Sequence, residues 1–219
     1  MASRPNQSEK AILEQYRVAF ENVSSNPEII AAMASFGYDD PTIAEGKTIY
    51  EAARASYDRN KQEDVESKLA KQDFHGKWNS LKSIYSLHRK KVKIIFRKEP
   101  DMLIRLNVVG QVPRSYLAWL DVVKRFYATI LADEILQQQV ARLNITPDEL
   151  TGASSALVEL EKSRADYLRE LGESEASTQK KNAALDAIDD WMGEFYAVAE
   201  LALEGNLQLL EILGKFVRS

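Results

Sequence analysis

The chain has 219 residues, of which 45% are hydrophobic, and its formal net charge is −4. This composition is typical of a soluble protein with a sizeable core, and the charge gives no general attraction to nucleic acid or anionic membrane. The absence of cysteine excludes disulfides, thiolate nucleophiles and cysteine-ligated metals. No apolar run approaches the roughly 20 residues that span a bilayer, and the first residues lack the apolar segment of a signal peptide. We therefore expect a cytoplasmic protein without a membrane partner.

Helix signals dominate the chain, and strand signals are missing. In chain order, the signals for helix starts are Ser8, Asp40 with Pro41, Ser115, and Thr146 with Pro147 and Glu149. These signals predict helices over residues 9–23 and 116–131, and they open two longer helical segments. Gly110 and Gly214 are predicted just past helix ends. The sequence therefore predicts an all-α protein.

The first half of the chain aligns with the second half. Residues 103–115 align with residues 207–219 at a shift of 104, whereas the region around Gly37 aligns with that around Asn144 at a shift of 107. Apolar positions are kept in both alignments, and glycine and asparagine share a tolerance of positive φ. The sequence therefore predicts a tandem repeat.

The change of shift suggests how each repeat is built. The two repeats are expected to differ by roughly three to six residues, and such a difference inside an unbroken helix would turn the following residues off their face, since each residue rotates by about 100°. A helix-turn-helix absorbs the difference in its turn. Residues 42–97 and 147–203 are therefore predicted to be two long antiparallel hairpins, with turns near Gly76 and Gly172. A single helix of about 56 residues in each segment is the alternative.

Apolar stripes predict how the hairpins pack. One seam in the first hairpin comprises Leu81, Tyr85, His88, Val92 and Ile95. Residues 185–203 are apolar nearly all round, which places them at the centre of the bundle or in a homo-oligomer interface. The expected fold is a pseudo-twofold helical bundle, in which a first repeat over 1–114 and a second over 115–219 pack together. The two hairpins face each other, and the shorter helices cap the bundle.

Residues 88–98, HRKKVKIIFRK, concentrate positive charge in a chain whose second half is acidic. The residues that we expect to matter for a partner surface are Arg89, Lys90, Lys93, Ile94 and Arg97. At a shift of 104 the counterpart is MGEFYAVAELA, which carries no lysine or arginine, so the fold does not require these charges. The stretch is interpreted as a solvated or loosely ion-paired face, a docking surface for an acidic partner, or a nucleic-acid site. The acidic second half and the lack of a reader motif argue against nucleic acid.

Catalytic patterns are missing. His75 and His88 lack the glutamate spacing of di-iron and zinc sites, and there is no P-loop, GxGxxG or GxSxG motif. We therefore expect no metal, no cofactor and no catalysis. The predicted function is that of a helical interaction or scaffold protein, whose partner is itself or another protein. The alternative is a small-molecule-binding bundle with a pocket between the two hairpins, to which Tyr85 and His88 would contribute polar groups.

Three segments carry a resemblance to known proteins: LALEGNLQLLEILGKFVRS, ALDAIDDWMGEFYAVAELAL and ITPDEL. Together they resemble a group of uncharacterised bacterial helical proteins of similar length that are built from two such repeats. The resemblance covers most of the chain, and its motifs are structural. It implies the two-repeat helical fold, and it implies no activity, cofactor or partner.

Overall fold

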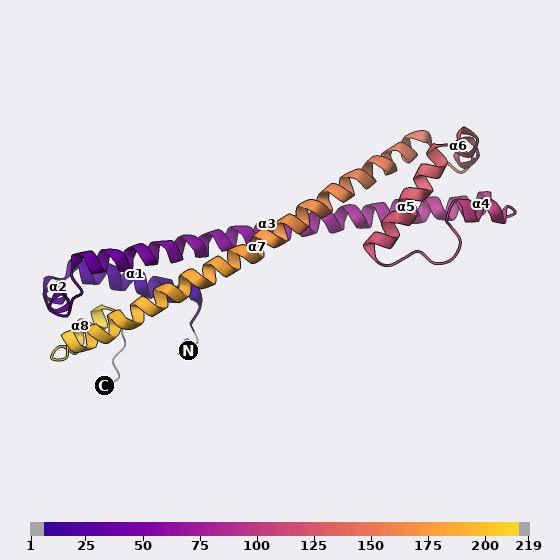
Figure 1. The fold of residues 1–219 in the computed structure, drawn as a ribbon. Helices are drawn as coiled ribbons and strands as arrows, with labels where there is room; N and C mark the ends of the chain where they lie inside the picture. The colour runs from indigo at the N-terminus through magenta and orange to yellow at the C-terminus, as the bar shows by residue number, and fades with distance from the viewer. Residues whose placement is uncertain (1–6, 215–219) are drawn as a thin grey trace. The chain divides into compact units, whose positions relative to one another are not determined.

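The structure, a computed structural model, describes residues 7–214 apart from the side chain of Leu207, and this part of the chain is helical without any strand (Figure 1). The helices are α1 (Glu9–Ser25), α2 (Pro27–Ala34), α3 (Asp40–Ile95), α4 (Pro100–Arg105), α5 (Tyr116–Leu131), α6 (Glu134–Ala141), α7 (Pro147–Ala202) and α8 (Leu207–Ile212). The all-α prediction is confirmed. In the described part of the chain, no helix combines the length and the apolarity needed to cross a membrane. Residues 215–219, which close the alignment at a shift of 104, lie outside the described residues.

Local side-chain caps start several helices where the sequence predicts them. Ser8 Oγ accepts a hydrogen bond from the backbone N of Ala11 at 3.3 Å at the start of α1. At the start of α7, the backbone N of Glu149 donates to Thr146 Oγ1, and the backbone N of Thr146 donates to Glu149 Oε2, both at 3.2 Å. This reciprocal pair is the capping box expected from the spacing. Ser115 is also the residue before α5, although its side chain makes no capping bond.

Two predicted helix boundaries are wrong, one at the start of a helix and one at the end of another. Asp39 caps α3 in place of Asp40, because Asp39 Oδ1 accepts a hydrogen bond from the backbone N of Thr42 at 3.2 Å. Gly110 lies in the loop before α5 and does not directly follow α4. The left-handed position after α4 is occupied by Asn107, with φ 54°, which an asparagine tolerates better than most residues.

The two predicted hairpins are wrong, because each segment is one unbroken helix. α3 and α7 both contain 56 residues, and the turns expected near Gly76 and Gly172 are helical. The alternative of two single long helices is therefore the observed arrangement. The predicted alternative function, a small-molecule-binding bundle, therefore stays a prediction without the hairpins in which its pocket was expected.

The helix positions explain this error. α2, α3 and α4 begin at residues 27, 40 and 100, and α6, α7 and α8 begin at residues 134, 147 and 207, an offset of 107 in each case. The left-handed residues follow the same offset, since Gly37 pairs with Asn144 and Asn107 with Gly214. The alignment at a shift of 104 is therefore out of register by nearly one helical turn. No length difference has to be absorbed inside the long helices.

The chain divides into two compact units, which are described separately. Unit 1 comprises Met1–Asp64 and Glu173–Ser219, and unit 2 comprises Val65–Gly172. Unit 1 therefore takes the beginning of α3 and the end of α7, and unit 2 takes the other parts of these helices. This division is distinct from the division into repeats at residues 114 and 115, which stays a prediction.

Unit 1 packs α1, α2 and α8 against the beginning of α3 and the end of α7 (Figure 1). Its core contains a group of aromatic rings, with the centroid of Trp191 at 5.3 Å from that of Phe20 and at 5.5 Å from that of Phe195. Asn60 Nδ2 donates to Thr178 Oγ1 at 3.0 Å, which joins α3 to α7. This core lies entirely within unit 1.

Unit 2 packs α5 and α6 against the end of α3 and the beginning of α7 (Figure 1). Phe74 of α3 stacks on Tyr167 of α7 with ring centroids 5.9 Å apart. Tyr85 of α3 meets Phe126 of α5 edge to face at 5.3 Å. The core of this unit is formed by its own residues, and such large aromatic side chains contribute much of the apolar area that a core buries.

Candidate functional site

The structure separates the side chains of the basic stretch. Arg89 Nη2 donates hydrogen bonds to the carbonyl oxygens of Val108 at 2.9 Å and Gly110 at 2.6 Å. Lys91 Nζ donates to the carbonyl oxygen of Asn144 at 2.9 Å. Arg89 and Lys91 thus hold neighbouring backbone segments of unit 2, and they lie outside the exposed stripe that contains Lys90 and Ile94.

Leu87, Lys90 and Ile94 follow one another at steps of three and four residues, so they form one exposed stripe near the end of α3, and the exposed Arg97 follows in the turn directly after the helix. Leu87 is 53% exposed and Ile94 is 56% exposed. We call these four residues the Ile94 surface. Lys93, which the sequence also singles out, is half-buried beside it.

The Ile94 surface has no acidic neighbour along α3. The sequence contains no aspartate or glutamate between Asp73 and Glu99. Arg97 Nη1 donates only weakly, at 3.4 Å, to the carbonyl oxygen of Ile94. The surface therefore presents two exposed aliphatic side chains among uncompensated positive charges, which is the composition of a docking surface for an acidic partner.

A second exposed stripe lies near the end of α7, in unit 1. At the offset of 107, Leu201 takes the position of Ile94, and it is 62% exposed. The residues that take the positions of Leu87, Lys90 and Arg97 are Glu194, Ala197 and Glu204, all exposed. We call Glu194, Ala197, Leu201 and Glu204 the Leu201 surface. It resembles the Ile94 surface in its exposed central aliphatic residue and has the opposite charge.

The sequence prediction missed the Leu201 surface. Residues 185–203 are not buried all round: Leu185, Met192 and Phe195 enter the core of unit 1, while Leu201 points away from it. The sequence does contain a signal for this surface, because an alignment of the two halves at a shift of 107 pairs Ile94 with Leu201. A register of 104 pairs Ile94 with the partly buried Val198 and conceals the relation.

His88 is a buried histidine with a hydrogen-bond partner in the core of unit 2, as its place on the apolar seam predicts. It is 3% exposed, and its Nδ1 lies 3.1 Å from Tyr127 Oη. Its Nε2 lies 3.8 Å from Glu149 Oε2. Burial lowers the pKa of His88, although the carboxylate of Glu149 acts in the opposite direction, and burial raises the pKa of Tyr127. A neutral imidazole and a neutral phenol sealed inside the core have no access to a substrate, so we assign them no catalytic role.

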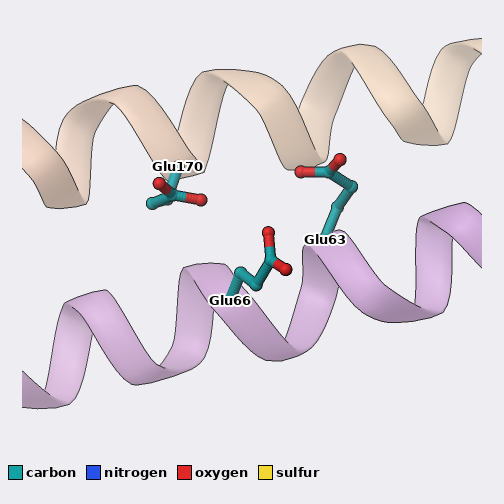
Figure 2. Close-up of side chains that lie close together, drawn as sticks. All are labelled: Glu63, Glu66 and Glu170. Atoms are coloured by element: carbon teal, nitrogen blue, oxygen red, sulfur yellow. The ribbon is translucent and has the colours of Figure 1, made fainter.

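Carboxylates approach one another on the long helices (Figure 2). Within unit 2, Glu66 of α3 and Glu170 of α7 have carboxylate oxygens within 4.8 Å of each other. Glu63, which belongs to unit 1, is buried, and its Oε1 accepts a hydrogen bond from Arg59 Nη2 at 2.9 Å. Acidic groups that gather on a helix surface are common in proteins without a bound cation, and no further ligand from unit 2 joins this pair. We assign no metal site to them.

Comparison with known proteins adds no function. No family model matches this chain, and no curated protein or solved structure is significantly similar to it. The resemblance to bacterial two-repeat helical proteins therefore stays an expectation.

Proposed function

We propose that the protein is a non-catalytic helical interaction protein that assembles with further copies of itself. The Ile94 surface of one copy binds the Leu201 surface of another. The observation that carries this proposal is the pair of exposed aliphatic residues, Ile94 and Leu201, which lie at equivalent helix positions among charges of opposite sign.

The physical basis is a combination of apolar contact and charge complementarity. Exposed aliphatic side chains gain free energy when a partner removes them from water, at about 25 cal/mol per Å². Opposite charges around such a contact raise the association rate and fix the partner's orientation. The charge distribution of the whole chain favours the same pairing, since residues 1–110 carry a net charge of +3 and residues 111–219 carry −7.

The offset of 107 between corresponding helices supports a tandem duplication with pseudo-twofold symmetry as the origin of the two surfaces. A duplication creates two equivalent stripes, and divergence of their charges then makes one complementary to the other. Two copies form a closed dimer when the Ile94 surface of each copy binds the Leu201 surface of the other. Otherwise the contact continues into a ring or a filament.

Charge reversal tests the proposal. We would measure the molar mass by light scattering over a range of protein concentrations, at low and high salt, for Arg97→Glu, Glu204→Arg and the double variant. Each single variant should assemble less than the unchanged protein, because like charges then meet across the contact. The double variant should recover assembly, because the charges are again opposite. High salt should weaken assembly of the unchanged protein.

Two further variants control for the fold and for the apolar contact. Arg142→Glu reverses an exposed arginine of unit 2 outside both surfaces and should leave assembly unchanged. Ile94→Glu should abolish assembly without lowering the helix content measured by circular dichroism. A protein that is monomeric at every concentration, or a double variant that assembles no better than the single ones, would overturn the proposal. A monomer that binds an acidic protein through Ile94 would indicate a different partner class.

A further inference from the structure

A cavity of about 420 Å³ lies in unit 2, between the end of α3, the loop before α5 and the first turn of α5. This volume lies in the range of small-molecule sites, roughly 300–1,000 Å³. The cavity differs from the Ile94 surface in the side chains that it uses, with Lys90 at the border of both. The cavity is therefore a separate candidate binding site.

The walls of the cavity are strongly cationic. Lys82, Arg89, Lys90 and Arg114 line it, and no aspartate or glutamate does. Among the described residues, no carboxylate forms an ion pair with any of these cations. Arg89 is held in place by its bonds to the carbonyl oxygens of Val108 and Gly110. Positive charges gathered without counter-charges around a concave site favour an anion.

Two of the four cations are positioned by the protein before any ligand arrives. The ammonium of Lys82 lies 3.5 Å from the centroid of the Trp78 ring, a cation–π contact that orients the side chain. Arg89 is fixed by the loop. A site whose charged groups are already ordered loses less conformational entropy on binding.

A buried hydroxyl adds a specific hydrogen-bond donor. Tyr85 lines the cavity and is 1% exposed, and its hydroxyl proton has no acceptor within hydrogen-bond distance among the described residues. Burial raises the pKa of Tyr85, and Arg89 acts in the opposite direction through its charge and by donating toward the phenol oxygen; a guanidinium cannot accept, so the phenol proton stays available. The phenol is therefore neutral near pH 7 and keeps its proton to donate. An unpaired buried donor is rare in native proteins and is satisfied when an acceptor enters the site.

The wall on the side of the loop and α5 carries an apolar surface. Val112, Pro113 and Trp119 form it, and Ser86 of α3 is the one further polar residue of the lining. The positions of Lys82, Arg89 and Lys90 correspond, at the offset of 107, to Asp189, Tyr196 and Ala197 in α7. Unit 1 therefore builds the same helix without these cations, so the charge of the cavity is not a requirement of the helix packing.

We propose that this cavity binds a small organic anion, whose carboxylate or phosphate group meets Lys82, Arg114 and the hydroxyl of Tyr85 and whose apolar body packs against Val112, Pro113 and Trp119. The anionic group alone leaves the apolar wall uncovered, and the apolar body alone leaves the cations unpaired. The site therefore discriminates in favour of ligands that combine both parts. The assignment does not depend on the assembly of the protein.

Calorimetric titration of the full-length protein tests the ligand class. The probes are phenyl phosphate and benzoate, which join an anion to an apolar ring, and inorganic phosphate and benzyl alcohol, which represent the separate parts. At least one of the first pair should bind at a single site, tenfold or more tighter than either part. The better of phenyl phosphate and benzoate identifies the preferred anionic group. Equal binding of inorganic phosphate would overturn the proposal, because it indicates an unspecific cationic surface.

Matched variants locate the binding. Arg114→Ala and Lys82→Ala should each weaken binding of the better probe by roughly tenfold, the usual effect of one charge-assisted contact. Arg142→Ala, which removes an exposed arginine of the same unit, should leave it unchanged. Tyr85→Phe should weaken binding severalfold while the midpoint of thermal unfolding stays the same or rises, because the variant loses a hydroxyl whose proton has no acceptor among the described residues.

Two outcomes contradict the site. Unchanged affinity in both Arg114→Ala and Tyr85→Phe would place the probe elsewhere, and the absence of saturable binding by either ring-bearing anion would remove the proposal. Arg97→Glu separates this proposal from self-assembly, because it acts on the Ile94 surface and leaves the cavity intact. That variant should bind the probe as the unchanged protein does, whatever its state of assembly.

Discussion

His88 is the buried group whose protonation bears most directly on stability near neutral pH. It is 3% exposed in the core of unit 2, and burial lowers its pKa below the ordinary value of 6.5. As the pH falls, the unfolded chain therefore binds a proton at this position before the folded protein does. Since the unfolded state then binds more protons, the free energy of unfolding decreases as the pH falls below about 6.5, and it continues to decrease until the folded pKa is reached.

A substitution isolates this contribution. We expect His88→Asn to flatten the pH dependence of the free energy of unfolding, measured by urea denaturation between about pH 8 and pH 5. The unchanged protein should lose stability over the lower part of this interval. His75→Asn is the matched control, since it removes the other histidine of the chain. Loss of the slope in the His75 variant and not in the His88 variant would contradict the assignment.

Gly46 of α3 makes room for the indole ring of Trp191 in unit 1. A methyl group at this position would overlap with the ring, whereas Gly193 of α7 faces open space. Overpacking in Gly46→Ala should lower the free energy of unfolding by about 1–3 kcal/mol. The better helix propensity of alanine offsets about 1 kcal/mol of that loss. Gly193→Ala should stabilise by about 0.5–1 kcal/mol. Urea denaturation of both variants checks the opposite signs, and stabilisation by Gly46→Ala would show that Trp191 moves aside freely.

At the scale of the helices, the sequence predicts what is decided locally. The cap at Ser8 and the capping box of Thr146 and Glu149 are set by residues three positions apart, and both are confirmed. The long helices were mispredicted as hairpins because the alignment at a shift of 104 implied a length difference that an unbroken helix could not hold. The constant offset of 107 between corresponding helices removes that difference, and the position of Asn107, which pairs with Gly214, becomes evident only from its positive φ.

The candidate sites were predictable only in part for a related reason. The basic stretch predicts a partner surface that includes Lys90, Ile94 and Arg97, and all three of these side chains are exposed. The sequence could not separate Arg89 from them, because Arg89 binds carbonyl oxygens about twenty residues further along the chain. The same non-local loop brings Arg114 to the cationic cavity. Contacts of this kind depend on the folded path of the chain and leave no periodic signal.

Glycine substitutions test whether the long helices are continuous. Gly76 in α3 and Gly172 in α7 lie where hairpin turns were expected, and a β-carbon at either position would meet no neighbouring atom. We expect Gly76→Ala and Gly172→Ala each to raise the free energy of unfolding by about 0.5–1 kcal/mol, because alanine is the better helix former. Urea denaturation measures the change. Destabilisation by both would indicate turns with positive φ, whereas stabilisation agrees with unbroken helices.

At the scale of the whole molecule, the two compact units cut across the order of the chain. The core of unit 2 draws only on residues between Phe74 and Tyr167, whereas the core of unit 1 joins residues from both ends of the chain. A cut at the predicted repeat boundary, between Arg114 and Ser115, would therefore separate α3 from the helices that cover it in unit 2. The unit, and not the repeat, is the part of the chain that contains a complete core.

Fragments distinguish these two ways of dividing the protein. A fragment of residues 65–172 retains the whole core of unit 2, so we expect it to be helical by circular dichroism and to unfold cooperatively on heating. A fragment of residues 1–114 carries Tyr85 and Phe74 without Phe126 and Tyr167, their partners in that core. It should lack a cooperative transition alone, and adding residues 115–219 should restore one, because the missing partners return. Cooperative unfolding of residues 1–114 as a monomer would show instead that a single repeat carries enough buried surface to fold.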